Sequence, residues 1–264
     1  MSKIEPVHLL FSILGGVVLL FIIAPLAGIF VNTSPGEFIN AASDGEVTGS
    51  IWLTLSASMG ATLIFAAGSV PLAYILARKD FPLKGLVNSI VDLPIVIPHS
   101  AAGIALLGVL SGGSLFGGAA ERIGIKFIGA PAGIMAGMAF VSVPFLINSA
   151  RDGFAAVPEV YEKAAMNLGA GPFRVFLTIS LPIAWRSVVS GLVLMWARGM
   201  SEFGAVIIIA YHPMITPVLI YERFGAFGLK YARPVSAVFL IVCFISFILL
   251  RSIGGGGKNY VKSQ

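Results

Sequence analysis

Six long runs of apolar residues limit what this 264-residue chain can fold into more than any other feature. A helix needs about 20 predominantly apolar residues to cross the hydrocarbon core of a bilayer. Only 11% of the residues are charged, whereas a soluble domain has about a quarter. We therefore expect an all-α membrane protein, with one transmembrane domain over residues 1–264 and six transmembrane helices near residues 7–31, 51–77, 87–110, 131–151, 184–210 and 232–253.

The net charge of +5 is explained by membrane orientation, so no nucleic-acid partner is expected. Lys and Arg are in excess in cytoplasmic loops. With the N-terminus inside, eleven basic residues fall in cytoplasmic segments and five in external ones. We expect a multi-pass protein of the plasma membrane, embedded in the lipid bilayer with both termini in the cytoplasm. The cytoplasmic residues are Lys3, Arg78, Lys79, Lys84, Arg151, Lys163, Arg174, Arg186, Arg251, Lys258 and Lys262, and the external ones are Arg122, Lys126, Arg223, Lys230 and Arg233.

The loop at residues 154–183 is amphipathic and is cytoplasmic in this orientation. Pro158 suits the first turn of a helix, and the acidic Glu159 favours the positive N-terminal end. Gly169 can adopt positive φ and end that helix after roughly 16 Å. A second short helix is expected to start at Pro172 and end at residues 181–182. The loop is thus predicted to form a helix, a glycine corner and a helix.

The spacing in this loop resembles the EAA loop of binding-protein-dependent ABC importer permeases. The shared pattern is Glu162-x-Ala164-Ala165, three residues, Gly169, nine residues, and Ile179-x-Leu181-Pro182. The resemblance implies a coupling helix that docks in a groove on an ATP-binding subunit, and small alanine side chains permit close docking. The alternative is an ordinary connector between membrane helices. The residues assigned to coupling are Glu159, Glu162, Ala164, Ala165, Leu168, Gly169, Ile179, Leu181 and Pro182.

The third expected helix contains Pro94 and Pro98. Each proline removes a backbone donor, so we expect this span to be kinked. Asp92 and His99 are polar residues in the same helix, and such residues usually face protein or water. Two interpretations remain: structural roles in the kink and in interhelical hydrogen bonds, or a general acid–base pair that no nucleophile or metal-ligand cluster accompanies.

The fifth expected helix carries Arg198 and Glu202 four residues apart, so they share a face and can pair. A charge near mid-membrane is costly, which predicts pairing or a water-filled path. Gly199 and Gly204 permit close helix approach. The pair either fixes helix packing or borders a pore in which Arg198 provides positive potential for an anion, and both roles can hold together.

Two external segments are expected to be structured. Residues 34–37, Ser-Pro-Gly-Glu, can cap a short interfacial helix in the loop at 32–50, which is either a landing surface for a partner or a solvated loop. Residues 211–230 are too polar and too rich in proline breaks to form a full span. We expect them to fold over the external mouth.

Four stretches together resemble the permease subunit of molybdate/tungstate ABC importers, most of all the archaeal-type members: residues 71–78, 92–99, 162–182 and 196–205. The resemblance implies a homodimer, two ATP-binding cassette subunits on the cytoplasmic side, and an external oxyanion-binding protein. It also implies a central path gated by the third and fifth helices. Sulfate permeases are near relatives, so sulfate or another anion is the alternative substrate.

The chain is not expected to be an enzyme. It has no Gly-x-x-x-x-Gly-Lys-Ser/Thr loop, so ATP and Mg²⁺ belong to the partner ATPase; no cofactor and no metal site are expected in the chain itself. A pore that bound a dianion tightly would trap it, so we expect only a modestly polar path, with Ser142 and Thr216 among its further candidates. The pore and gate candidates are Pro94, Pro98, His99, Ser100, Arg198, Ser201, Glu202 and Phe203.

A proton-coupled secondary transporter and an intramembrane hydrolase are the two rival functions. A proton-coupled secondary transporter would use Asp92, His99, Arg198 and Glu202 as its relay. An intramembrane hydrolase would need a Ser/His dyad, paired Asp or His-Glu-x-x-His at helical spacing, and none is apparent. Neither rival needs an alanine-faced cytoplasmic helix, so the loop at 154–183 favours the importer.

Overall fold

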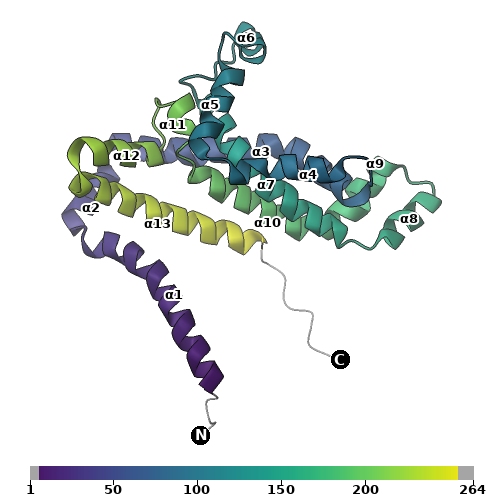
Figure 1. Ribbon diagram of the computed structural model, residues 1–264, viewed down its shortest axis with the longest axis horizontal. Helices are drawn as coiled ribbons and strands as arrows, with labels where there is room; N and C mark the ends of the chain where they lie inside the picture. Colours follow the sequence, from purple (N-terminus) through teal and green to yellow (C-terminus); the bar gives the residue numbers. More distant parts are fainter. Residues whose placement is uncertain (1–5, 255–264) are drawn as a thin grey trace.

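The computed structural model describes residues 6–254, and all regular structure in that part of the chain is helical (Figure 1). The predicted cytoplasmic termini, with Lys3, Lys258 and Lys262, lie outside the described residues. The elements are α1 (Pro6–Val31), α2 (Pro35–Ser43), α3 (Gly45–Arg78), α4 (Lys84–Val96), α5 (His99–Leu110), α6 (Leu115–Arg122), α7 (Pro131–Ala155), α8 (Glu159–Asn167), α9 (Pro172–Val175), the π-helical turn η1 (Phe176–Ser180), α10 (Leu181–Met200), α11 (Val206–Ile209), α12 (Thr216–Phe227) and α13 (Leu229–Gly254).

The expected all-helical membrane architecture is confirmed. Five helical segments within residues 6–254 are long and apolar enough to cross a bilayer, and the bent pair α4–α5 is a sixth if it is counted as one span. The expected spans at 7–31, 131–151 and 232–253 correspond to α1, α7 and α13. The other three expected spans need correction.

Local backbone chemistry explains two of these corrections. α3 starts at Gly45, six residues before the expected start at 51, because the side chain of Asp44 accepts a hydrogen bond from the amide of Glu46 at 2.8 Å and caps the helix. The helix expected from Pro172 does start there, as α9, but it does not end at residues 181–182: it continues through η1 into α10, so the span expected at 184–210 begins earlier. Pro182 has no amide donor, and the wide π-helical turn before it accommodates that loss.

The third and fifth expected spans are both interrupted. The span expected at 87–110 is broken at residues 97–98, where α5 turns away from α4 by 113°. The span expected at 184–210 ends at Met200 and is followed by the short helix α11. A kink was expected in the first case, and the structure replaces it with a sharp change of direction.

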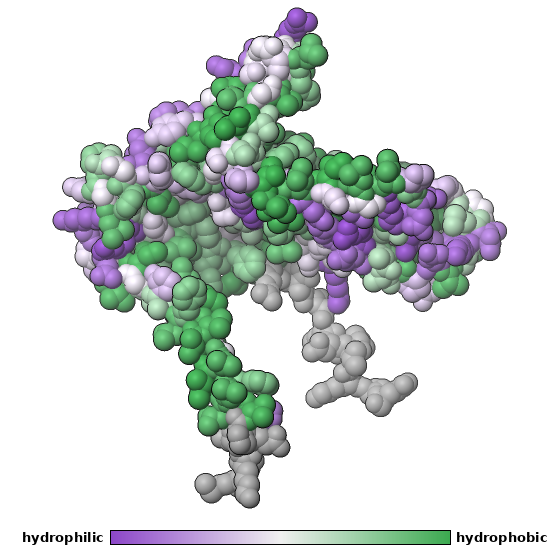
Figure 2. Space-filling model, viewed as in Figure 1, coloured by the Kyte–Doolittle hydropathy of each residue, from purple (hydrophilic) through white to green (hydrophobic). Residues whose placement is uncertain are grey.

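The core lies between α3, α7 and α10, which run side by side along the length of the molecule (Figure 1). α7 is the most enclosed of the spanning helices, with 56% of its most apolar window buried, and its Ile134, Met138 and Leu146 are fully buried. α1 is the opposite case, with 0% buried, and it lies apart from the bundle with an apolar surface (Figure 2). Such a surface is suited to lipid or to another apolar chain.

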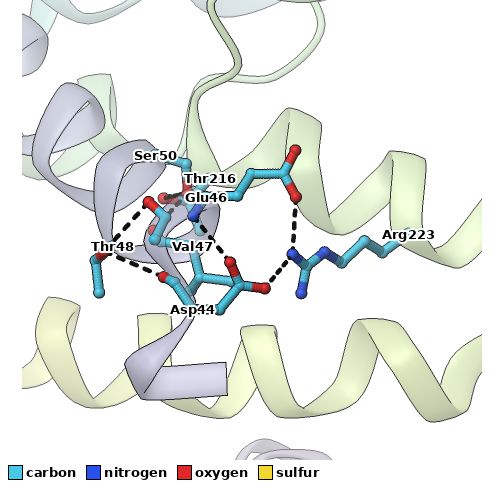
Figure 3. A network of polar contacts seen from close by, with 8 residues as sticks. Asp44, Glu46, Val47, Thr48, Ser50, Thr216 and Arg223 are labelled. Carbon is cyan, nitrogen blue, oxygen red and sulfur yellow. Dashed lines mark hydrogen bonds and ion pairs between the residues drawn. The ribbon is translucent and has the colours of Figure 1, made fainter. Parts of the chain in front are cut away.

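The end of the bundle that carries α2 and α12 is fastened by polar contacts. Ser34 and Glu37 form the expected capping box at the start of α2. Arg223 of α12 contacts Asp44 at 2.6 Å and Glu46 at 2.8 Å, so one guanidinium connects α12 to the start of α3 (Figure 3). The amide of Thr216 donates to the hydroxyl of Thr54 at 2.9 Å and fastens the other end of α12 to α3.

Candidate coupling helix and translocation path

α8 projects from the end of the bundle opposite to α2 and α12 (Figure 1). It follows Pro158 and ends before Gly169, whose φ of 86° is the left-handed conformation expected at this corner. Val160 and Tyr161 of α8 and Leu168, which follows it, are 63%, 54% and 90% exposed, and hydrophilic residues lie among such apolar ones at this end of the molecule (Figure 2). Exposed apolar side chains in a polar setting mark a contact surface for another protein.

Glu162 is the one buried residue of α8, and it points into the protein. Its Oε1 lies 2.9 Å from Nε of Arg78, at the end of α3, and accepts a hydrogen bond from Ser180 of η1 at 2.7 Å. Arg78 also donates to the carbonyl of Val157 at 2.7 Å. The side chains of Arg78 and Glu162 are only 8% and 7% exposed. Glu162 therefore braces α8 against α3 and against the turn that leads into α10, so any part it has in coupling is through this internal contact and not through an exposed side chain.

The other residues assigned to coupling divide into two groups. We call the projecting segment 159–169, which is α8 with the corner at Gly169, the elbow. Exposed residues on it are Glu159, Ala164, Leu168 and Gly169, and Ala165 is half-buried. The ammonium of Lys163, 2.7 Å from the Glu159 carboxylate, holds the pKa of that carboxyl below its usual value. Residues 179–182, in contrast, lie in η1 and the first turn of α10 and form the base of the elbow.

The break between α4 and α5 is built from prolines. Pro98 immediately precedes α5, while Pro94 is buried inside α4 and leaves that helix without one backbone donor. Ile97 is extended, with φ −70° and ψ 144°, as expected for a residue that precedes proline. His99 and Ser100 consequently form the first turn of α5, next to the break.

Arg198, Glu202 and His99 meet where α10 ends. Glu202 Oε2 lies 3.2 Å from Arg198 Nη1 and 2.7 Å from His99 Nδ1, and Arg198 Nη2 lies 2.8 Å from His99 Nε2. Neither contact of Oε2 has good hydrogen-bond geometry. Glu202 Oε1 accepts a hydrogen bond from the amide of Ala205 at 2.9 Å. The expected pairing of Arg198 with Glu202 is confirmed, and His99 joins it from another element.

The three side chains of this cluster differ in how deeply they are buried. The side chain of Glu202 is 0% exposed, that of Arg198 is 24% exposed and that of His99 is 37% exposed. A Cβ atom added at Gly204 would lie 2.6 Å from Cβ of His99, so the glycine permits this close approach. The Glu202 carboxylate is therefore covered by the side chains of Arg198 and His99.

The remaining pore candidates are distributed around this cluster. Ser100 and Ser201 are exposed, and Ser201 accepts a contact from Arg198 Nη1 at 3.3 Å. Phe203 is half-buried and its ring centroid lies 5.0 Å from that of Tyr221 on α12. Pro94 is buried and Pro98 is exposed. The structure thus brings most of the candidates from two distant segments to one place.

Two other candidates for the polar path do not lie on an open surface. Ser142 is 1% exposed and donates to the carbonyl of Met138, and Thr216 is 0% exposed and bonds to Thr54. Both belong to the packing inside the chain.

Asp92 and His99 have separate partners. Asp92 accepts a hydrogen bond from Asn148 of α7 at 2.6 Å, whereas His99 contacts the end of α10. An acid–base pair between Asp92 and His99 is therefore not formed. Within residues 6–254, no group of three or more His, Cys, Asp or Glu side chains is arranged to hold a metal ion.

Sequence reasoning missed two contributors to these sites. Arg78 and Ser180 hold Glu162, but they are 84 and 18 residues away from it along the chain. Arg78 belongs to one of the stretches that carry the family resemblance, yet no local pattern indicates its partner.

Comparison with known proteins agrees with this geometry. Residues 69–254 match the family "Binding-protein-dependent transport system inner membrane component". The molybdate/tungstate transport system permease protein of Thermococcus kodakarensis is 41% identical over 248 residues, covering 93% of this chain and 95% of that one. Its counterpart in Methanocaldococcus jannaschii is 40% identical over 237 residues, covering 90% and 92%. A probable sulfate transport system permease protein of Nephroselmis olivacea is 27% identical over 250 residues, covering 92% and 88%.

Solved structures show the same fold. A chain of a bacterial ABC transporter that imports the acidic polysaccharide alginate superposes with a TM-score of 0.72 at 17% identity, covering 95% of this chain and 96% of that one. A chain of an inward-facing methionine ABC transporter superposes with a TM-score of 0.60 at 17% identity, covering 79% and 93%. The chain therefore belongs to the binding-protein-dependent transport system inner membrane components, multi-pass permeases that are not themselves enzymes, and within them to the molybdate/tungstate permease family.

Proposed function

We propose that this chain is the membrane-spanning subunit of an ATP-driven importer that moves molybdate and tungstate into the cell. The observation that carries the proposal is the elbow at α8, which exposes Val160, Tyr161 and Leu168 while Glu162 braces it internally. A helix that is both exposed and braced can transmit force from a second protein. The choice of oxyanion is supported by the 41% identity to a molybdate/tungstate permease, against 27% to a sulfate permease.

The working assembly is proposed to contain two copies of this chain, two ATP-binding subunits and an external oxyanion-binding protein. Nucleotide and Mg²⁺ belong to the ATP-binding subunits, because this sequence has no phosphate-binding loop of the Gly-x-x-x-x-Gly-Lys-Ser/Thr type. The exposed apolar surface of α1 supports burial against lipid and against the second copy. In this arrangement both termini are cytoplasmic, and the external partner docks at the end that carries α2 and α12.

Alternating access follows from how the parts are joined. The elbow is fixed to α3 by Arg78 and to the helix that becomes α10 by Ser180, so both helices follow its displacement. The far end of α10 contacts α5 through the Arg198–His99–Glu202 cluster. A motion that starts at an ATP-binding subunit can therefore reach the break between α4 and α5, where we place the gate.

A sulfate permease is the alternative that the relatives support, since the sulfate-type protein covers 92% of this chain. A proton-coupled secondary transporter has less support. Its relay would connect Asp92 to His99, and these residues have separate partners on α7 and α10. The proton-coupled mechanism also gives α8 no role.

The proposal is tested by reconstituting the chain in liposomes with its ATP-binding and oxyanion-binding partners. We expect ATP hydrolysis and ion uptake to rise together with molybdate or tungstate, and to be insensitive to a proton uncoupler. Competition among tungstate, molybdate and sulfate identifies the preferred ion. Uptake that continues without the ATP-binding subunits, or that an uncoupler abolishes, would contradict the proposal.

A further inference from the structure

The cluster of Arg198, His99 and Glu202 lies deep in the membrane part of the molecule. Gly199 is the residue after Arg198. A Cβ atom added at Gly199 would lie 3.5 Å from Cβ of Ser58 on α3, so Arg198 and Ser58 lie at about the same depth along the bundle. Ser58 lies 13 residues after Gly45 and 20 residues before Arg78. At 1.5 Å per residue, the cluster is about 20 Å from the outer end of α3 and about 30 Å from its cytoplasmic end.

At this depth, partly exposed polar side chains such as Arg198 and His99 need polar surroundings. Arg198 and His99 are 24% and 37% exposed, and Ser100 and Ser201 are exposed beside them. An ionised arginine is costly in hydrocarbon and almost always faces protein or water at mid-membrane. This face therefore borders protein or water and not the lipid.

The exposed groups on this face are donors that suit a tetrahedral oxyanion. Arg198 presents a guanidinium, which binds oxyanions through several N–H groups. His99 and Ser100 form the first turn of α5, where backbone amides lack helical partners and the helix dipole is positive. In broken membrane helices, half-helix N-termini of this kind point at anionic groups of the substrate.

We infer that Arg198, His99 and Ser100 form a transient binding station for the transported oxyanion, an inference that rests on the proposed function. Glu202 limits the affinity of this site for the anion. Its buried carboxylate lies 3.2 Å from Arg198 and shares the positive charge, so the station attracts an anion but holds it weakly. A weak site is what passage requires, because a tightly held ion would block the path.

Variants that replace a charged side chain by a neutral one of similar size distinguish oxyanion binding from a purely structural ion pair. Glu202→Gln removes the competing carboxylate, so binding of radiolabelled tungstate to the permease–ATPase assembly, without the binding protein, should rise about tenfold, as for a gain of one charge-assisted contact. Uptake should slow because the ion leaves more slowly. Arg198→Gln should abolish this binding, whereas Arg198→Lys should retain most of it. Arg186→Gln, at an exposed position on the cytoplasmic half of the same helix, is the matched control and should behave as wild type.

The double variant Arg198→Gln/Glu202→Gln decides the question, since it leaves no unpaired charge and should assemble. We expect this variant to lose binding of radiolabelled tungstate as Arg198→Gln does, because the guanidinium is gone, although no buried carboxylate is left unpaired. Wild-type uptake in the double variant, or equal tungstate binding by all variants, would overturn the station and leave the proposed function intact. Absence of oxyanion-stimulated hydrolysis in the wild-type assembly would instead refute the proposed function, and the station with it.

Discussion

The brace between α3 and α8 should determine how firmly the elbow is held. Arg78 and Glu162 contact each other at 2.9 Å with side chains 8% and 7% exposed, and Ser180 shares the same carboxylate oxygen. Glu162→Ala removes one member and leaves the guanidinium buried without its counter-charge. Removing one partner of a buried pair costs about 3–5 kcal/mol.

This cost should appear as local detachment of α8. Glu162 is the only buried residue of that helix, so little else holds the helix in place. A loss of about 3–5 kcal/mol corresponds to an increase of roughly a hundredfold to a few thousandfold in the equilibrium constant for detachment. A detached elbow still binds an ATP-binding subunit through its exposed side chains but transmits no displacement to α3.

Hydrogen exchange and transport stoichiometry together measure this effect. In Glu162→Ala, the amides of α8 should exchange faster than in wild type while those of α7 stay protected. ATP consumed per ion imported should rise. Asp80→Asn is the matched control. It breaks the ion pair between Asp80 and Lys84 at the same end of the molecule, but the Asp80 side chain is 99% exposed, so this loss should cost little. Unchanged exchange in α8 and an unchanged ATP-to-ion ratio in Glu162→Ala would refute the reasoning.

Three further predictions address other parts of the chain. Gly169→Val should strain the corner at φ 86° by about 1–2 kcal/mol and raise ATP use per ion, whereas Gly169→Asn should be tolerated; normal coupling in the valine variant would count against the corner. Gly204→Ala places a Cβ 2.6 Å from that of His99, so uptake should fall while binding of the ATP-binding subunit, measured by co-purification, is preserved; full uptake would show that the close approach is dispensable. The hydrogen bond from Arg223 lowers the pKa of Asp44, so this pair stabilises the fold above the ordinary aspartate pKa and the stabilisation is lost as pH falls through the lowered value. Thermal unfolding between about pH 6 and pH 3 should therefore depend less on pH in Arg223→Gln than in wild type, and parallel curves would exclude this contribution.

The sequence predicted the features that depend on local chemistry. Apolar length located α1, α7 and α13, and proline and glycine located the start and the corner of the elbow. The i, i+4 spacing of Arg198 and Glu202 predicted their contact. Each of these depends on residues close together in the chain, where helix geometry leaves few alternatives.

Features that depend on distant residues were beyond the sequence pattern. A proline indicates that a helix is interrupted but not by what angle, so the 113° turn between α4 and α5 was expected only as a kink. The inward orientation of Glu162 depends on Arg78, 84 residues earlier, and the position of His99 depends on Arg198, 99 residues later. Such pairings are decided by tertiary packing.

The length of α3 has a consequence for signalling between the two sides of the membrane. Its 34 residues extend for about 51 Å, and the hydrocarbon layer is about 30 Å thick, so a single rod emerges into water at both faces. Its outer tip follows Asp44, which Arg223 grips, and its inner tip is Arg78, which holds the elbow. In the proposed importer, one continuous helix therefore joins the end where the binding protein docks to the elbow that contacts the ATP-binding subunit.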